Sequence, residues 1–233
     1  MFEKNIHPLQ TAPWQRHELL YVAPSAWAVA LTAQSLEGLP LLAGWADHGW
    51  PVIVRRRMNG DDVNMVPVGV PLPPAAGKLR IAISIPREAV TARAAPPSMR
   101  AIELTGKPDW EPIIKALLAL GEQHGIEPAV FGSLLWEHHT GLDYLSPTSD
   151  VDLIWPVGAS CDVARLLDGI AQIERAAPMR IDGEIVFPKG GAVNWRELHK
   201  AVDNKGPAEI LIKTMDGALV YNPRHLPGCE RLQ

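Results

Sequence analysis

The sequence has little cysteine, little phenylalanine or tyrosine, and no long apolar run. Only 2 of the 233 residues are cysteines, Cys161 and Cys229, and their separation fits no metal-binding motif. Such sparse cysteine is typical of a cytoplasmic protein whose thiols remain reduced. The apolar stretches are too short to cross a bilayer, and the first residues lack the basic and apolar segments of a signal peptide. We therefore expect a cytoplasmic protein with no membrane partner.

The sequence also has no excess of basic charge. It has 22 Lys and Arg residues against 26 Asp and Glu residues, a formal net charge of -4. This balance argues against general binding to nucleic acid or anionic membranes, so we expect no nucleic-acid partner. Proline is abundant instead, with 22 residues, which indicates many short elements joined by rigid turns.

The run Ala94-Ala95-Pro96-Pro97-Ser98 is the best candidate for a domain boundary. It predicts a strand-rich N-terminal domain over residues 1–95 and a second domain over residues 96–233. In the first domain, β-branched runs bounded by turn residues predict strands, and a helix is expected over residues 86–95. The expected strands cover residues 51–57, 65–70 and 78–86.

The second domain alternates expected helices and strands, the pattern of helices layered on a sheet. Apolar residues at helical spacing, with capping residues at the ends, predict the helices. We therefore predict an α+β fold for the chain. The expected helices of this domain cover residues 109–125, 160–176 and 194–202, and the expected strands cover residues 129–131, 150–156, 179–187 and 209–214.

Two aspartates lie in or beside an apolar run near the middle of the chain. Asp150 and Asp152 alternate with Val151 and Leu153, and a strand directs alternate side chains to one face. Two carboxylates about 7 Å apart on one strand repel each other. A divalent cation removes that cost, because Mg²⁺ is held by one or two carboxylates together with substrate phosphates. The alternative is a solvated turn pair, but strand propensity disfavours aspartate between apolar residues.

A Gly-Ser pair precedes these aspartates and follows an apolar run. Gly132 lets a ligand approach the backbone closely. Ser133 is suited to cap the helix that the following residues LLWEHH indicate, and a helix N-terminus attracts phosphate. The combination predicts a phosphate-binding turn facing a pair of metal-binding carboxylates.

A third carboxylate is Asp182, in the expected strand segment from Arg180 to Ile185. If this segment pairs beside the first aspartates, Asp182 completes a site for two cations that clamp the attacking and leaving oxygens. The alternative is a β-turn at Asp182-Gly183, which that dipeptide often marks. Glu184 lies on the same face and is the substitute candidate.

Three groups of basic residues are candidates to bind phosphate. Lys213 ends an apolar strand and Arg196 opens a helix, and the alternative for each is an ordinary surface cation. Lys189 with the following two glycines fits a phosphate-facing loop, although a hairpin turn is the preferred interpretation. The cluster Arg55–Arg57 is interpreted first as a solvated strand edge and second as a nucleotide- or partner-binding patch.

Other motifs are missing. His138 and His139 lack the four-residue spacing of a zinc-binding helix, and no P-loop, dinucleotide fingerprint or nucleophile elbow is present. Trp136, Trp155 and Trp195 are expected to be core residues.

Gly132-Ser133, Asp150-Val151-Asp152 and Arg180-Ile181-Asp182 together resemble the polymerase-β-like nucleotidyltransferase superfamily. FGSLLWEHHTGLDYLSPTSDVDLIW, DGEIVFPKGGAVNWREL and LIKT, with VIVRRR and VPVGV, resemble one family in it more closely. That family is the phosphoribosyl-dephospho-CoA transferases of malonate decarboxylase, also called its holo-acyl-carrier-protein synthases. The spacing from Gly-Ser to Asp-x-Asp is longer than usual in the superfamily, and the extra residues 139–148 are typical of the narrower family.

This resemblance implies a polymerase-β-like catalytic domain with a mixed sheet. It implies transfer of a prosthetic group from 2′-(5″-triphosphoribosyl)-3′-dephospho-CoA to a serine of the acyl carrier protein subunit of malonate decarboxylase, with release of pyrophosphate. The N-terminal domain is expected to bind the substrate or the carrier protein. The implied cofactor is Mg²⁺, with Mn²⁺ as an alternative, bound by Asp150, Asp152 and Asp182. The implied phosphate-binding residues are Gly132, Ser133, Lys213 and Arg196.

Two other functions remain as alternatives. The first is a different nucleotidyltransferase that adenylylates a protein or a small molecule. The second is a catalytically inactive member of the superfamily that acts as a binding module, against which the retained Asp150 and Asp152 argue.

Overall fold

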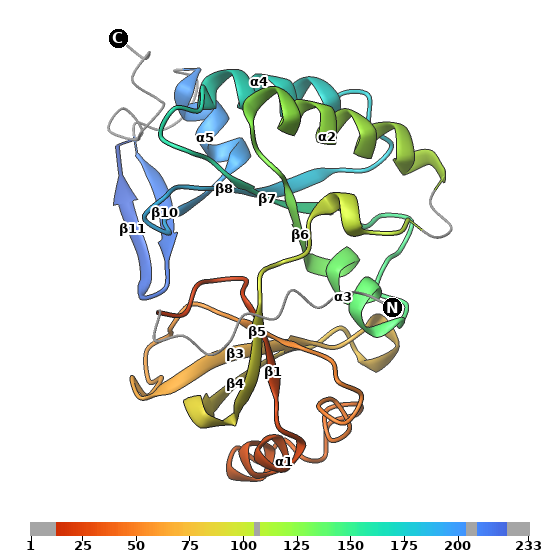
Figure 1. Cartoon of the computed structure of the whole chain (residues 1–233), viewed down its shortest axis with the longest axis vertical. Helices are drawn as coiled ribbons and strands as arrows, with labels where there is room; N and C mark the ends of the chain where they lie inside the picture. Colours follow the sequence, from red (N-terminus) through yellow and green to blue (C-terminus); the bar gives the residue numbers. More distant parts are fainter. Residues whose placement is uncertain (1–12, 105–107, 204–208, 223–233) are drawn as a thin grey trace. The chain divides into compact units, whose positions relative to one another are not determined.

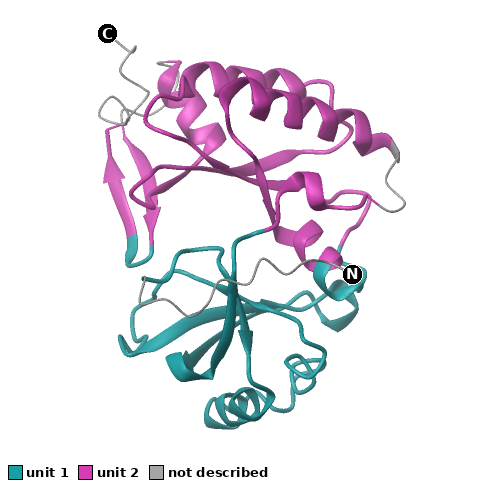
Figure 2. Cartoon of the chain, viewed as in Figure 1, with its two compact units in different colours: residues 1–96, 139–144, 215–217 teal, residues 97–138, 145–214, 218–233 magenta. Residues whose placement is uncertain are grey.

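The computed structural model of the chain describes residues 13–104, 108–203 and 209–222. The chain divides into two compact units (Figure 2): residues 1–96, 139–144 and 215–217 form unit 1, and residues 97–138, 145–214 and 218–233 form unit 2. Unit 1 contains an antiparallel sheet, and unit 2 contains a mixed sheet with helices. The predicted α+β class is therefore confirmed.

Unit 1 is built on a five-stranded sheet of order β4-β3-β2-β1-β5. Alternation places Val66, Val68 and Val70 of β3 on a buried face, each at most 1% exposed. Helix α1 contacts β4, and Trp27 in α1 is fully buried and donates its indole N–H to the Leu42 carbonyl at 2.7 Å. The elements are β1 (Leu19–Val22), α1 (Pro24–Ala33), β2 (Val52–Val54), β3 (Met65–Pro71), β4 (Arg80–Pro86) and β5 (Val90–Ala94), with short 3-10 turns at Pro74–Ala76 and Arg87–Ala89.

The helix expected over residues 86–95 is wrong. Only one 3-10 turn follows Pro86, and β5 then pairs with β1 in antiparallel register. Two contacts explain the change: the β-branched Val90 is buried in the sheet, and Arg93 forms a bidentate ion pair with Glu18 across the two strands at 2.6 and 2.8 Å. Pairing with a distant strand overrode the local pattern.

Unit 2 is built on a six-stranded sheet of order β11-β10-β9-β8-β7-β6, in which only β7 and β8 have a described parallel register. Its elements in chain order are α2 (Glu111–His124), β6 (Ala129–Phe131), α3 (Gly132–Thr140), β7 (Val151–Pro156), α4 (Val163–Glu174), β8 (Ile181–Val186), β9 (Ala192–Asn194), α5 (Trp195–Val202), β10 (Ile210–Thr214) and β11 (Gly217–Tyr221), with 3-10 turns at Met99–Ala101 and Pro108–Trp110.

One face of this sheet forms the core of unit 2. In β7, Val151, Leu153 and Trp155 are fully buried, and Ile181 and Ile185 continue the layer in β8. Helices α2, α4 and α5 pack side by side over this layer, as Figure 1 shows. The apolar positions of α4 recur at helical spacing and all face inward: Val163, Leu166, Leu167 and Ile170 are fully buried. The three tryptophans expected in the core, Trp136, Trp155 and Trp195, are at most 3% exposed.

The remaining expectations for unit 2 have mixed outcomes. Asp182-Gly183 lies inside β8, so the turn alternative is wrong at that position. The hairpin turn after Lys189 is confirmed by hydrogen bonds between Phe187 and the two glycines. Strands β9 and β11 were not expected. Cys229 lies outside the described residues, and none of the described helices is both long and apolar enough to cross a membrane.

Candidate active site

The candidate site is on the face of the unit 2 sheet opposite the buried layer. Asp152 lies in register between Phe131 of β6 and Asp182 of β8. Because side chains of directly paired residues project to the same face, β7 and β8 bring these two carboxylates together. Both residues are half-buried, while their neighbours Val151 and Leu153 are buried on the opposite face.

Gly132 lies directly against Asp152. It begins α3 with a positive φ of 67°, a conformation that favours glycine. A Cβ atom at this position would be 1.9 Å from Asp152 Oδ2. The Asp152 carboxylate therefore occupies the space that a side chain would need, at the first turn of α3 and next to Ser133. The structure thus brings Gly132 of the predicted Gly-Ser turn against Asp152 of the predicted carboxylate strand.

Asp150 directly precedes β7 and is half-buried. The turn before it is closed by two hydrogen bonds. The Ser146 N–H donates to the Ser149 hydroxyl at 2.8 Å, and the Ser149 N–H donates to the Ser146 carbonyl at 3.1 Å. The start of β7 is tied to β8 by a hydrogen bond from Val151 N–H to the Arg180 carbonyl at 2.9 Å. These hydrogen bonds fix the backbone on both sides of Asp150.

Asp182 is held by two donors on one of its oxygens. Its Oδ1 accepts hydrogen bonds from Gly183 N–H at 2.8 Å and from Asn194 Nδ2 at 2.9 Å, and Oδ2 is 4.0 Å from Arg180 Nη2. The backbone of Gly183 is itself tightly packed, because a Cβ there would be 2.1 Å from the Leu153 carbonyl oxygen. Strands β7 and β8 therefore lie so close at this point that only glycine fits between them.

Glu184 and Lys213 form an ion pair on the same face. Lys213 Nζ donates to Glu184 Oε1 at 2.9 Å, and the Glu184 side chain is only 6% exposed. The ammonium compensates the charge of this buried carboxylate. Lys213 lies opposite Ala192 of β9, so its β-strand position directs it to the carboxylate face.

Arg196 is engaged elsewhere. Its guanidinium makes a bidentate ion pair with Glu174 and donates to the Ile181 carbonyl, and its Cζ lies 4.5 Å from the centre of the Trp195 ring. Burial would raise the pKa of Glu174, but the Arg196 hydrogen bond, the Ile181 N–H and nearby arginine charges together lower it. These contacts tie the start of α5 to the end of α4.

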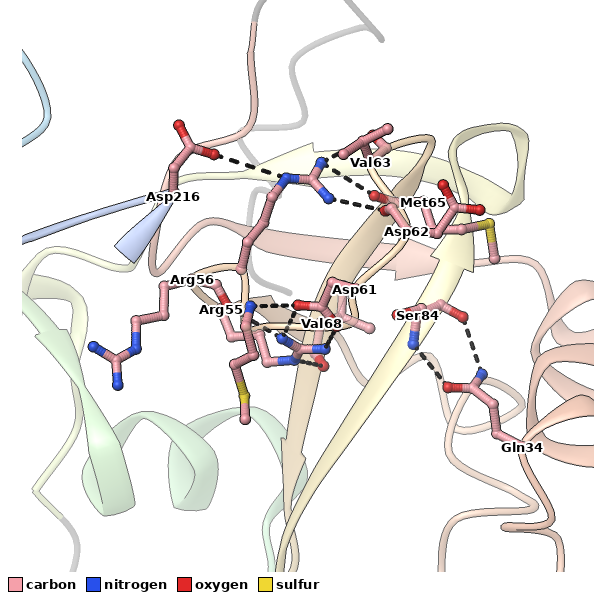
Figure 3. Close-up of polar contacts among 12 residues, drawn as sticks. Gln34, Arg55, Arg56, Asp61, Asp62, Val63, Met65, Val68, Ser84 and Asp216 are labelled. Atoms are coloured by element: carbon pink, nitrogen blue, oxygen red, sulfur yellow. Dashed lines mark hydrogen bonds and ion pairs between the residues drawn. The ribbon is translucent and has the colours of Figure 1, made fainter. Parts of the chain in front are cut away.

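The arginine cluster of unit 1 is built into its own loop (Figure 3). Arg55 forms a bidentate ion pair with Asp61 at 2.6 and 2.7 Å, and Arg57 donates to the carbonyls of Asp62, Val63 and Met65. The Arg55 hydrogen bond lowers the pKa of Asp61. Arg56 is the exposed member, and its side chain points away from this network. Two of the three arginines are thus neither a solvated edge nor an open patch.

Among the described residues, the ligand atoms of three side chains lie within 4.8 Å of one another: Asp168, His199 and Asp203. His199 Nε2 is 3.0 Å from Asp168 Oδ1, and both aspartates are exposed. The oxygens of Asp150, Asp152 and Asp182 are not gathered this closely. No local spacing in the sequence reveals this helical group, because its members come from α4, from α5 and from the residue that caps the end of α5.

Two residues that hold predicted site residues had no role in the sequence predictions. Asn194 donates to Asp182, and Glu174 holds Arg196. A signal for Asn194 is present in Asn194-Trp195-Arg196-Glu197, which has the spacing of a capping box. No local pattern reveals Glu174, which lies 22 residues before Arg196.

Comparison with known proteins gives a consistent result over the two units. The phosphoribosyl-dephospho-CoA transferase MdcG N-terminal domain matches residues 15–96, and the MdcG C-terminal domain matches residues 98–223. A phosphoribosyl-dephospho-CoA transferase of Bradyrhizobium diazoefficiens is 37% identical over 214 residues, covering 91% of this chain and 92% of that protein. One from Xanthomonas campestris pv. campestris is 34% identical over 203 residues, covering 87% and 91%. No solved structure matches the chain.

The matching family models and the named relatives show that this chain is a transferase enzyme. Matches to both domains cover most of its length. The chain belongs to the phosphoribosyl-dephospho-CoA transferase family.

Proposed function

We propose that this chain transfers the 2′-(5″-phosphoribosyl)-3′-dephospho-CoA group from its triphosphate precursor to a serine of the apo acyl carrier protein subunit of malonate decarboxylase. Family membership supports the nature of the transferred group. The observation that carries the reaction type is the contact between Gly132 and Asp152, which joins a helix start suited to phosphate with a carboxylate suited to a cation.

In the proposed reaction, the acceptor serine oxygen attacks the α-phosphorus and forms a phosphodiester. The bond from that phosphorus to the bridging oxygen of the β-phosphate breaks, and pyrophosphate leaves with the electron pair. The serine proton is released. Such a displacement needs groups that hold the polyphosphate in line and compensate its charge, since positioning and electrostatics supply most of the catalysis.

The proposed cation ligands are Asp150, Asp152 and Asp182. Their donor atoms are all carboxylate oxygens, which suit Mg²⁺ or Mn²⁺. The space that a Cβ of Gly132 would fill holds the Asp152 carboxylate, so the backbone is already shaped around it. A cation bound there would neutralise charge on the phosphates. The cation would also offset the repulsion between these carboxylates.

The proposed phosphate-binding groups are Gly132, Ser133 and Lys213. Backbone N–H groups at the start of α3 and the Ser133 hydroxyl are suited to orient the leaving pyrophosphate. Lys213 uses one donor on Glu184 and has others for a phosphate oxygen. Arg196 is the weaker candidate, because its guanidinium already contacts Glu174 and the Ile181 carbonyl.

Between the two carboxylates of β8, we propose Asp182 as the third ligand. Glu184 is buried and its charge is compensated by Lys213, whereas Asp182 is partly exposed, with 28% of its side-chain surface accessible. We further propose that residues 1–95 bind the substrate or the carrier protein and that residues 96–233 carry catalysis. The exposed Arg56 is the unit 1 residue best suited to meet an acidic carrier protein.

The proposal is tested by intact-mass spectrometry of the apo carrier protein after incubation with the chain and Mg²⁺. One reaction contains the CoA-derived triphosphate and the other contains ATP. We expect the mass of the phosphoribosyl-dephospho-CoA group to be added in the first reaction only. Transfer from ATP alone would indicate an adenylylating enzyme, and transfer from neither donor would indicate a binding module; both results contradict the proposal.

Two matched variants locate the site in the same assay. Asp152→Asn removes a proposed cation ligand without changing side-chain size, and we expect it to abolish transfer. Asp168→Asn makes the same chemical change in the helical group and is expected to retain transfer. The opposite pattern would move the cation site to the helices.

A further inference from the structure

Asn194 connects the third carboxylate to the start of a helix. It is the last residue of β9 and the N-cap of α5. Its Oδ1 accepts hydrogen bonds from Arg196 N–H at 3.0 Å and, more weakly, from Glu197 N–H at 3.4 Å. Its Nδ2 donates to Asp182 Oδ1 at 2.9 Å. One side chain therefore caps a helix and holds a proposed cation ligand.

The orientation of this amide is set by its partners. The backbone N–H groups of α5 require an acceptor, and the Asp182 carboxylate requires a donor, so the oxygen must face the helix and the nitrogen must face Asp182. Aspartate would cap α5 equally well but would place a second carboxylate against Asp182. Serine also caps well, but its shorter side chain has no group at the position of Nδ2, from which Asn194 donates to Asp182. Asparagine meets both demands.

This contact decides which oxygen of Asp182 is available. Gly183 N–H and Asn194 Nδ2 both occupy Oδ1, so Oδ2 is the oxygen with capacity for a ligand. Asp182 lies beside Asp152 in the parallel pair, on the proposed cation side. Glu184 lies opposite Asn194 in the β8–β9 register but bonds to Lys213 instead. Of these two carboxylates, the Asn194 amide is therefore directed to Asp182.

We infer that Asn194 is a positioning residue for the cation site: it fixes Asp182 so that Oδ2 is presented to a divalent cation shared with Asp152. This inference rests on the proposed function. Residues that hydrogen-bond a metal ligand orient it, and their loss typically weakens metal binding or activity by about 10- to 100-fold.

The test measures Mn²⁺ binding to the full chain by electron paramagnetic resonance, without substrate, alongside the transfer assay. The binding event of the site is identified as the one lost in Asp152→Asn. In Asn194→Ser, which keeps a cap for α5, we expect the Mn²⁺ dissociation constant of that event to rise by about 10- to 100-fold. The midpoint of Mg²⁺ activation should rise in parallel.

Thermal unfolding separates positioning from stability. Asp162→Ser makes a corresponding cap exchange on α4, where Asp162 accepts from Arg165 N–H at 3.2 Å. We expect similar, small changes of unfolding temperature in both variants and weaker Mn²⁺ binding only in Asn194→Ser. Asn194→Thr, which also keeps a capping hydroxyl, provides a second variant if the serine variant folds poorly.

Each remaining outcome is decisive. Unchanged Mn²⁺ binding in folded Asn194→Ser or Asn194→Thr overturns the inference and leaves the proposed function intact. Equal weakening in Asp162→Ser would show a general effect of helix capping and also overturns it. If the parent chain has no binding event that depends on Asp152, the cation site and this inference both fail, and the mass assay reports separately whether transfer occurs.

Discussion

Replacement of Gly132 by alanine is the sharpest test of the site. The new Cβ would be 1.9 Å from Asp152 Oδ2, 2.5 Å from its Cγ and 2.9 Å from its Cβ. Because real Cβ atoms essentially never approach within 3.0 Å, the carboxylate must leave its position. A displacement of about 1 Å at a catalytic group costs on the order of 10²-fold in rate. We therefore expect Gly132→Ala to lower kcat/KM for carrier-protein modification by about 100-fold or more.

The backbone makes a separate contribution that needs a control. Gly132 has a φ of 67°, and an L-residue in the left-handed conformation costs roughly 1–2 kcal/mol. Gly141 has a nearly equal φ of 69°, and a Cβ there would meet no atom within 4 Å. Gly141→Ala therefore has the same backbone strain without the clash. We expect it to lose similar conformational stability but to keep transfer activity.

The assays are intact-mass spectrometry for transfer and urea denaturation for the free energy of unfolding. If Gly132→Ala retains full activity, the Asp152 position is not required for catalysis, and the proposed site is wrong. If Gly141→Ala loses as much activity, backbone strain rather than the clash explains the effect. A further check is the double variant Gly132→Ala/Asp152→Ala, in which the clash is reduced. Its loss of stability should be smaller than the sum of the two single losses.

Three further predictions concern charged residues. The pKa of Asp61 is lowered, chiefly by the Arg55 hydrogen bond, so this pair stabilises the fold above about pH 4 and the stabilisation is lost as pH falls through the folded-state pKa. Asp61→Asn should flatten this acid dependence in urea denaturation measured from neutral to acid pH. Arg196→Met should lower the free energy of unfolding by roughly 1–3 kcal/mol with an unchanged KM for the triphosphate, and a large rise in that KM would instead support a phosphate contact. Lys213→Met should raise this KM by about tenfold, equivalent to about 1.4 kcal/mol, whereas Lys115→Met, which breaks an exposed pair with Glu111, should not.

The central part of the fold could be predicted because its sequence signals are local. Apolar alternation around Asp152 and in the segment after Arg180 indicates two strands with one face buried, and the structure pairs them directly. The helix at residues 163–174 follows from the spacing of its apolar residues. It begins after its cap Asp162, rather than at Ser160 as expected. Periodicity also gives the face on which each carboxylate lies.

The failures concern contacts between distant residues. Strand β5 is held by β1, which lies about seventy residues earlier, as the contact of Arg93 with Glu18 illustrates. The engagement of Arg196 by Glu174 depends on where α4 ends relative to α5, which no short motif records. A charged residue in the sequence has no visible partner, so an arginine already used for structure is easily mistaken for one that binds a ligand.

The close approach of β7 and β8 at Gly183 limits how the site can be altered. With the Leu153 carbonyl 2.1 Å from where a side chain would begin, no side chain can be added at this position without displacing the backbone. Asp152 and Asp182 therefore sit on a spacing that the main chain dictates. To favour a larger ion, such as Ca²⁺, an engineer would have to lengthen or replace the side chains that bind it, because the strand backbone at Gly183 does not accept a substitution.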